Sequence, residues 1–276
     1  MIGIVFLLLG AFGAAVMALI IVMFFDATRG GADRVASERE REARQWLPPF
    51  ARGAELVYWA SRRARGAVRR ALEGEPGAST PRTIITALHD GATRAMLPRV
   101  RARDRARPVA CPREGQGTIG VTGIEALALA EHLREDLSAS ELAAVQRRSR
   151  EIAALLAKGD PAAVVPPCAL QSGDCMCIAY PTRPLNCRPL HAAATADRLG
   201  LDGGVPGGRV PLWLRHAETV AAGVEQGLRS ALEQAGLDGR IYELHSALAC
   251  ALERPDGSRR FMAGENPFAA ARPLRA

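Results

Sequence analysis

The chain has 276 residues, of which 48% are hydrophobic and 24% are charged, and this balance excludes wholesale disorder. Six cysteines are too few for a disulfide-stapled scaffold. The net charge of +7 is modest, but it is concentrated: residues 26–110 carry 18 arginines against 10 acidic residues. The basic excess therefore belongs to one stretch and is not a property of the whole chain.

An uncharged apolar run extends from Met1 to Phe25. As a helix it would be roughly 37 Å long, and a bilayer core needs about 20 such residues. A cleaved signal peptide would begin with basic residues and end at small ones, whereas this run has no basic residue before it and ends in Met23-Phe24-Phe25. We therefore expect a retained transmembrane helix over residues 1–25.

Basic residues follow the apolar run directly, and they predict its orientation. The positive-inside rule places such residues in the cytoplasm. The arginines within about 20 residues of the run are Arg29, Arg34, Arg39, Arg41 and Arg44. We expect a single-pass protein of the inner (cytoplasmic) membrane with its C-terminal domain in the cytoplasm.

Residues 26–110 are predicted to be a basic juxtamembrane segment and linker. Within them, residues 46–70 carry aromatic and apolar side chains followed by five arginines, an amphipathic stretch that can lie on an anionic lipid surface. The alternative is a solvated helix that packs its aromatic residues on the domain. The second basic run, over residues 94–107, has no interleaved aromatic residues and no known fold motif, so a nucleic-acid partner is not expected.

Residues 111–276 are predicted to form a small helical domain. Capping boxes at Thr122–Glu125 and Ser138–Glu141 each open a helix, and the short loop between these helices suggests an antiparallel pair. Apolar spacing predicts two more helices. The four expected helices cover residues 122–137, 138–158, 212–235 and 241–252. Between the second and third lies Pro166–Gly208, a long stretch without helical or strand periodicity, for which function is the usual reason.

Four cysteines lie in a 20-residue segment of that stretch: Cys168, Cys175, Cys177 and Cys187. A cytoplasmic domain keeps thiols reduced, which favours metal binding over disulfides. Thiolates prefer zinc, copper(I) or iron–sulfur clusters. The positive charges of Arg183 and Arg188 would favour thiolates there. The spacing C-x6-C-x-C-x9-C is not a common zinc-finger spacing, so a redox pair or buried structural cysteines stay open as alternatives.

The core of this stretch, Cys177-x-x-Tyr180-x-x-Arg183-Pro184-x-x-Cys187-Arg188, resembles the YkgJ-type cysteine-cluster family, whose members are described as zinc- or iron-chelating. The resemblance covers roughly residues 111–268 and leaves the apolar and basic stretches outside. It departs from the family at an upstream C-x-x-C-C, where only Cys111 is present. The resemblance implies Cys168, Cys177 and Cys187 as ligands, with Cys111 or the additional Cys175 in fourth place and His191 as a weaker candidate.

We predict a mainly α fold: one N-terminal transmembrane helix and a small α-helical domain organised around an irregular cysteine-rich metal-binding loop. The expected function is chelation of zinc or iron. Two alternatives use the same cysteines: an iron–sulfur redox protein, and a membrane-tethered interaction module whose metal is purely structural. The chain has no nucleophile elbow, P-loop or dinucleotide fingerprint, which favours a binding protein over an enzyme. The isolated histidines His89, His132, His216 and His245 are expected to be structural or solvent-facing.

Overall fold

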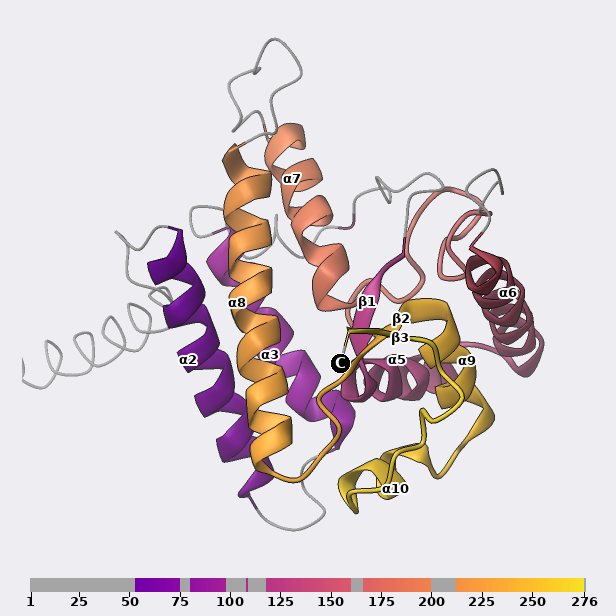
Figure 1. Cartoon of the computed structure of the whole chain (residues 1–276). Helices are drawn as coiled ribbons and strands as arrows, with labels where there is room; N and C mark the ends of the chain where they lie inside the picture. Colours follow the sequence, from indigo (N-terminus) through magenta and orange to yellow (C-terminus); the bar gives the residue numbers. More distant parts are fainter. Residues whose placement is uncertain are drawn as a thin grey trace, which may run out of the picture. The chain divides into compact units, whose positions relative to one another are not determined.

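The computed structural model describes residues 53–74, 80–97, 108, 118–159, 166–199 and 212–275. This part of the chain is mainly helical, which confirms the predicted α class (Figure 1). The expected transmembrane helix at residues 1–25 lies outside the described residues. Within them, no helix combines the length and the apolar character needed to span a bilayer.

Helices make up most of the described part, and three short strands accompany them. The helices are α2 (Ala54–Leu72), α3 (Pro81–Met96), α5 (Gly123–Asp136), α6 (Ala139–Lys158), α7 (Arg188–Arg198), α8 (Leu212–Gln234), α9 (Leu244–Glu253) and α10 (Gly257–Met262), with a 3-10 turn η1 (Leu185–Cys187) before α7. The strands are β1 (Gly120–Thr122), β2 (Ile241–Glu243) and β3 (Pro273–Arg275).

Both predicted capping boxes are present. The Thr122 hydroxyl accepts a hydrogen bond from the Glu125 amide at the start of α5, and the Glu125 carboxylate accepts one from the Thr122 amide. Ser138 and Glu141 make the same exchange at the start of α6. Gly159 ends α6 with φ of +65°, a conformation that only glycine adopts at no steric cost.

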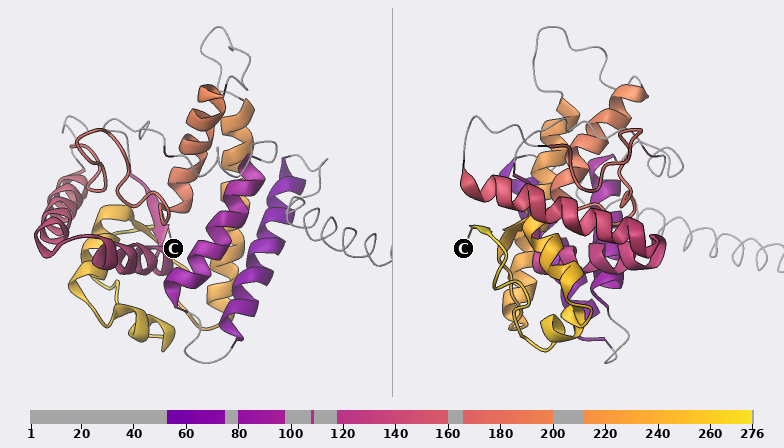
Figure 2. Two further views of the ribbon diagram at one scale, coloured as in Figure 1. Left: turned by 180° about the vertical axis from the view of Figure 1, so that it is seen from behind. Right: turned by 90° about the vertical axis from the view of Figure 1, so that its right-hand side faces the viewer.

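The expected antiparallel pairing of these two helices is only a minor contact. Helix α6 packs mainly against α9, and Figure 2 (right) shows α6 crossing in front of it, whereas α5 packs against both α3 and α9. The hydrophobic face of α6 is therefore buried by a helix about 100 residues away in sequence.

The expected fourth helix begins later than its apolar spacing predicts. Ile241–Glu243 is strand β2, and the helix α9 starts at Leu244. Strand β2 lies between β1 and β3 in an antiparallel sheet, with Val121 opposite Tyr242. The prediction of helix over residues 241–243 was wrong because the ladder bonds to two distant strands outweigh the local apolar period.

Helix α7 is a second correction, since it lies inside the stretch expected to be irregular. It contains Pro189 in its first turn, where proline costs no hydrogen bond, followed by several alanines, which favour helix. The prediction that all of Pro166–Gly208 lacks regular structure was therefore wrong for residues 188–198. The part that bears Cys168, Cys175 and Cys177 contains only turns and an isolated bridge.

Helix α2 lies directly against α8 (Figures 1 and 2). Two glycines of α8 make the close approach possible. A Cβ added at Gly223 would lie 2.6 Å from the Val57 carbonyl oxygen, and one at Gly227 would lie 2.2 Å from the Ser61 carbonyl oxygen. The small side chains Ala60 and Ala64 of α2 are fully buried at this contact.

One hydrophobic core contains residues from both sides of the expected domain boundary at residue 111. Leu56 of α2 and Ile85 of α3 belong to the same buried cluster as Ile124 of α5 and Leu248 of α9. The described residues of the predicted juxtamembrane segment, 53–74 and 80–97, therefore form two packed helices that share a core with the cysteine-bearing part.

Candidate metal centre

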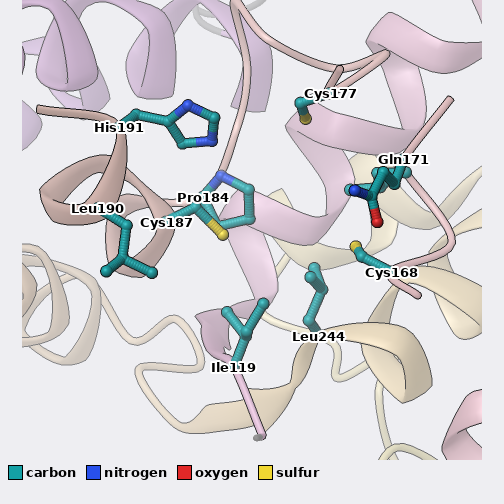
Figure 3. A pocket seen from close by; sticks show the side chains of 10 residues that line it. Ile119, Cys168, Gln171, Cys177, Pro184, Cys187, Leu190, His191 and Leu244 are labelled. Carbon is teal, nitrogen blue, oxygen red and sulfur yellow. The ribbon is translucent and has the colours of Figure 1, made fainter. Parts of the chain in front are cut away.

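Three cysteines and one histidine line a small pocket at the centre of the cysteine-bearing part. Figure 3 shows Cys168, Cys177, Cys187 and His191 around a common space. The other walls are almost entirely apolar and include Ile119 and the side chains of Leu190 and Leu244. Its volume of about 30 Å³ is enough for one or two water-sized bodies.

The loop that carries Cys168 and Cys177 turns back on itself. Gln171 pairs with Cys177 in an isolated bridge, and the Ile178 amide donates to the Leu170 carbonyl at 2.9 Å. On α6, Arg148 donates to the Cys168 carbonyl at 2.9 Å. These bonds bring two cysteines that are nine positions apart to one side of the pocket.

The segment with Cys187 is held by the buried carboxylate of Glu125. Its Oε1 accepts a hydrogen bond from the Leu185 amide at 2.8 Å, at the start of η1. The same oxygen lies 3.1 Å from Nε2 of His89 on α3. The capping box of α5 thus also fixes the third cysteine, because Glu125 serves both the helix start and η1.

Two buried arginines lie beside the cysteines. Arg183 is 4% exposed, its guanidinium lies 3.8 Å over the Tyr180 ring, and it donates to the Tyr180 carbonyl at 2.5 Å. Burial lowers the pKa of Arg183, and the charges of Tyr180, Cys177 and Cys187 act in the opposite direction. A buried cation is costly without a compensating negative charge.

Arg188 is the second of these cations and is 3% exposed. It donates to the Thr93 hydroxyl at 2.7 Å and to the Pro181 carbonyl at 3.1 Å. Burial, followed by the charge of Arg183, lowers its pKa to about 9. Among the described residues, Nε of each of the two arginines has no hydrogen-bond partner. The charge of Asp90 favours the charged form of both arginines, and that of Glu125 favours it at Arg188.

His191 is 2% exposed and packs edge-on against Tyr180, with 5.4 Å between ring centroids. Burial, and then the charges of Arg183 and Arg188, lower its pKa to about 3. The ring is therefore neutral at physiological pH, the form in which histidine binds metal. Its Nδ1 has no hydrogen-bond partner within the described part of the chain.

His245, which the sequence analysis took as structural or solvent-facing, is buried beside the Cys168–Ala169 backbone and does not line the pocket. The Glu243 carboxylate accepts hydrogen bonds from the His245 amide and ring Nδ1, both at 2.9 Å. Nε2 of His245 accepts a hydrogen bond from the Ala169 amide at 3.4 Å, and the neighbouring Cys168 favours the charged form of the ring. Burial opposes the charged ring, but the interactions with Cys168 and Glu243 outweigh it and raise the pKa of His245 to about 9. Only the spacing Glu-x-His at a helix start could have indicated this pair.

The predicted ligands fall into three groups. Cys168, Cys177 and Cys187 line the pocket, and His191 joins them. Cys175 is exposed at the tip of a turn with φ of +62° and is not among the lining residues. Cys111 lies outside the described residues. Within the ranges that are described, no three histidine, cysteine or acidic side chains lie close enough together to hold a metal ion.

The chain was compared with known proteins in three ways. No protein-family model, no curated protein and no solved structure matches it. The resemblance to the cysteine-cluster family therefore stays a prediction that depends on the motif residues alone.

Proposed function

We propose that this chain is a membrane-anchored protein that binds zinc or iron through its cysteine cluster on the cytoplasmic side. The observation that carries the proposal is the pocket shared by Cys168, Cys177, Cys187 and His191. Three thiolates and a neutral imidazole are a donor set that suits zinc. Because the side chains are too far apart to hold an ion as they stand, the loop must close on it when the ion binds.

The buried arginines support a site that holds negative charge. A divalent ion with three thiolates carries a net negative charge, and Arg183 and Arg188 lie where they would offset it. His245, held by Glu243, would stabilise the negative charge of the Cys168 sulfur, as residues behind metal ligands commonly do. The chemistry of these residues therefore suits a thiolate-bound ion, which would draw the side chains together on binding.

The donor set favours a single zinc over the iron–sulfur alternative. Iron–sulfur clusters are usually held by four cysteines, whereas three cysteines and a histidine line this pocket. When bound, the ion would cross-link the cysteine loop to η1, which is compatible with a structural role as well as with chelation.

Metal analysis of the full chain, purified in detergent without oxygen, tests the proposal. We expect about one zinc or iron per chain, and loss of most of it in Cys177→Ser and Cys187→Ser. Cys250→Ser is the matched control, because Cys250 is half-buried in α9 away from the pocket. Folded variants that retain full metal would contradict the site, and a visible iron–sulfur absorption band would favour the redox alternative.

The membrane part of the proposal has a separate test. A reporter enzyme that is active only in the cytoplasm, fused after Ala276, should be active in intact cells. Activity only from a periplasmic reporter would overturn the orientation and, with it, the argument that the thiols stay reduced.

A further inference from the structure

Helix α2 carries a basic surface that the proposed metal centre does not use. Five arginines line a surface hollow of about 740 Å³ with Trp59 and, from the end of α8, Gln234. These arginines are Arg62, Arg63, Arg65, Arg69 and Arg70. Among the described residues, no acidic side chain lines the hollow. Gly66 lies between the arginines, and a Cβ there would come within 3.4 Å of Nη1 of Arg70.

The opposite face of α2 is fully occupied by the protein itself. Leu56, Ala60, Ala64 and Val68 are buried, and the contact with α8 is close enough to require Gly223 and Gly227. A helix whose apolar face is buried in its own domain has none left to insert into a bilayer. Any membrane contact of α2 must therefore be made by its charged face, at the level of the headgroups.

We infer that the arginine face of α2 binds the phosphate groups of an anionic lipid surface. Arginine forms paired hydrogen bonds to phosphate oxygens, and several basic residues together attract an anionic leaflet. Tyr58, 53% exposed at the edge of this face, is the kind of residue found at membrane interfaces. The inference depends on the proposed attachment through residues 1–25, which would keep α2 near the membrane.

Nucleic acid is the other polyanion to consider, and the aromatic residues argue against it. Single strands bind by stacking bases on open aromatic faces. Here Tyr58 and Trp59 pack edge to face at 5.5 Å, and the Arg62 guanidinium lies 5.7 Å from the Trp59 ring centre. The Tyr58 hydroxyl accepts a bond from Arg62 at 3.3 Å. These rings are engaged with one another and with Arg62.

Arginine footprinting on the full chain tests the inference. The protein is placed in nanodiscs of phosphatidylcholine alone, or of equal parts phosphatidylcholine and phosphatidylglycerol, and is modified with phenylglyoxal. Modification of each arginine is then measured by mass spectrometry. Since one basic residue near an anionic surface gains about a fivefold preference, we expect Arg62, Arg63 and Arg70 to react at least threefold more slowly in the anionic discs.

Two exposed arginines elsewhere serve as internal controls. Arg147 and Arg259 have side chains 68% and 84% exposed and lie on α6 and α10, so their rates should not change. The protection of α2 should also disappear at about 1 M salt, where the screening length falls to about 3 Å. Equal rates for the α2 arginines in both discs, or equal protection of Arg259, would overturn the inference.

Three additional measurements distinguish lipid binding from nucleic-acid binding and from failure of the proposed anchor. Protection by added polyuridylate in neutral discs, without protection by anionic lipid, would assign the surface to nucleic acid and overturn the lipid assignment. Failure of the chain to enter neutral discs would contradict the proposed anchor instead. In the variant Arg62→Glu/Arg63→Glu, protection of Arg70 should be lost, while the variant Arg147→Glu should keep it.

Discussion

Glu125 shows how much one buried side chain can organise. Its carboxylate, 3% exposed, caps α5 through Thr122, meets His89 of α3 and accepts the Leu185 amide ahead of Cys187. Bonds to His89, Thr122 and Leu185 overcome burial and lower the pKa of Glu125. The charged carboxylate therefore connects the first helices to the cysteine pocket, and its neighbours should influence stability through their own titration.

The lowered pKa of His89 leads to a prediction about the stability of the protein in acid. Burial, and then the charge of Arg188, lower its pKa to about 4 although Glu125 acts in the opposite direction. An unfolded histidine has a pKa of about 6.5. As the pH falls from 6.5 to 4, the unfolded chain therefore gains a proton that the folded chain does not, and the free energy of unfolding decreases by up to about 1.4 kcal/mol per pH unit.

The substitution His89→Gln keeps a donor for Glu125 and removes this titration. In urea unfolding measured with chelator at pH 7, 6, 5 and 4.5, the variant should lose less stability toward acid, by a total of about 2 kcal/mol. His132 and His191 titrate in both proteins, so the difference reports the coupled pair of His89 and Glu125. Parallel curves for variant and wild type would show that His89 accepts its proton in the folded state.

At single residues, the resemblance to the cysteine-cluster family predicted the pocket cysteines better than the spacing of the cysteines did. The cysteine pattern predicts Cys168, Cys177 and Cys187 together, and the three line one pocket. The resemblance set Cys175 apart as a candidate for the fourth place only, and the structure exposes it at the tip of a turn. His245 was missed because its bond to the Ala169 amide joins residues 76 positions apart, and a lone histidine in a helix carries no local signal.

Among elements, locally determined features were predicted and non-local ones were not. Capping boxes and the glycine stop of α6 depend on residues within one turn, and both are present. The strand β2 has three residues and depends on partners before α5 and at the end of the described chain. The contact of α2 with α8 depends on Gly223 and Gly227, which helical periodicity treats only as weak positions.

The crossing of α2 and α8 predicts opposite effects for two identical substitutions. Gly227→Ala would place a methyl group 2.2 Å from the Ser61 carbonyl oxygen, a backbone atom that cannot move without separating the helices. Gly66→Ala, on the facing helix, meets only the flexible end of Arg70 at 3.4 Å. Each change gains about 1 kcal/mol of helix propensity, so their difference isolates the packing.

We expect Gly227→Ala to lower the free energy of unfolding by about 1–3 kcal/mol, and Gly66→Ala to leave it unchanged or raise it by up to about 1 kcal/mol. Urea unfolding followed by circular dichroism measures both. If Gly227→Ala is as stable as Gly66→Ala, the two helices do not cross at this separation.

At the scale of the whole described structure, the pocket is a meeting point. Its lining comes from Ile119 before β1, the cysteine loop, the η1–α7 segment and Leu244 at the start of α9. The Leu244 amide donates to the Ile119 carbonyl at 2.8 Å, which connects the two sides of this wall. An ion bound there would therefore cross-link segments that otherwise share only buried apolar contacts, short strands and hydrogen bonds.

Removing the metal should consequently loosen this region more than the α2–α8 pair. A ligand at 100 times its dissociation constant stabilises a protein by about 2.7 kcal/mol. In a domain of this size, that corresponds to a melting temperature lower by roughly 5–10 °C after chelation. By hydrogen exchange, the amides of Ile178, Leu185 and Leu244 should lose protection, while the amides of α2 and α8 should keep theirs.

Cys250→Ser should respond as the wild type does, and Cys187→Ser should melt at the lower temperature with or without metal. If protein shown to contain metal keeps its melting temperature and its exchange pattern after chelation, the ion is bound outside this pocket.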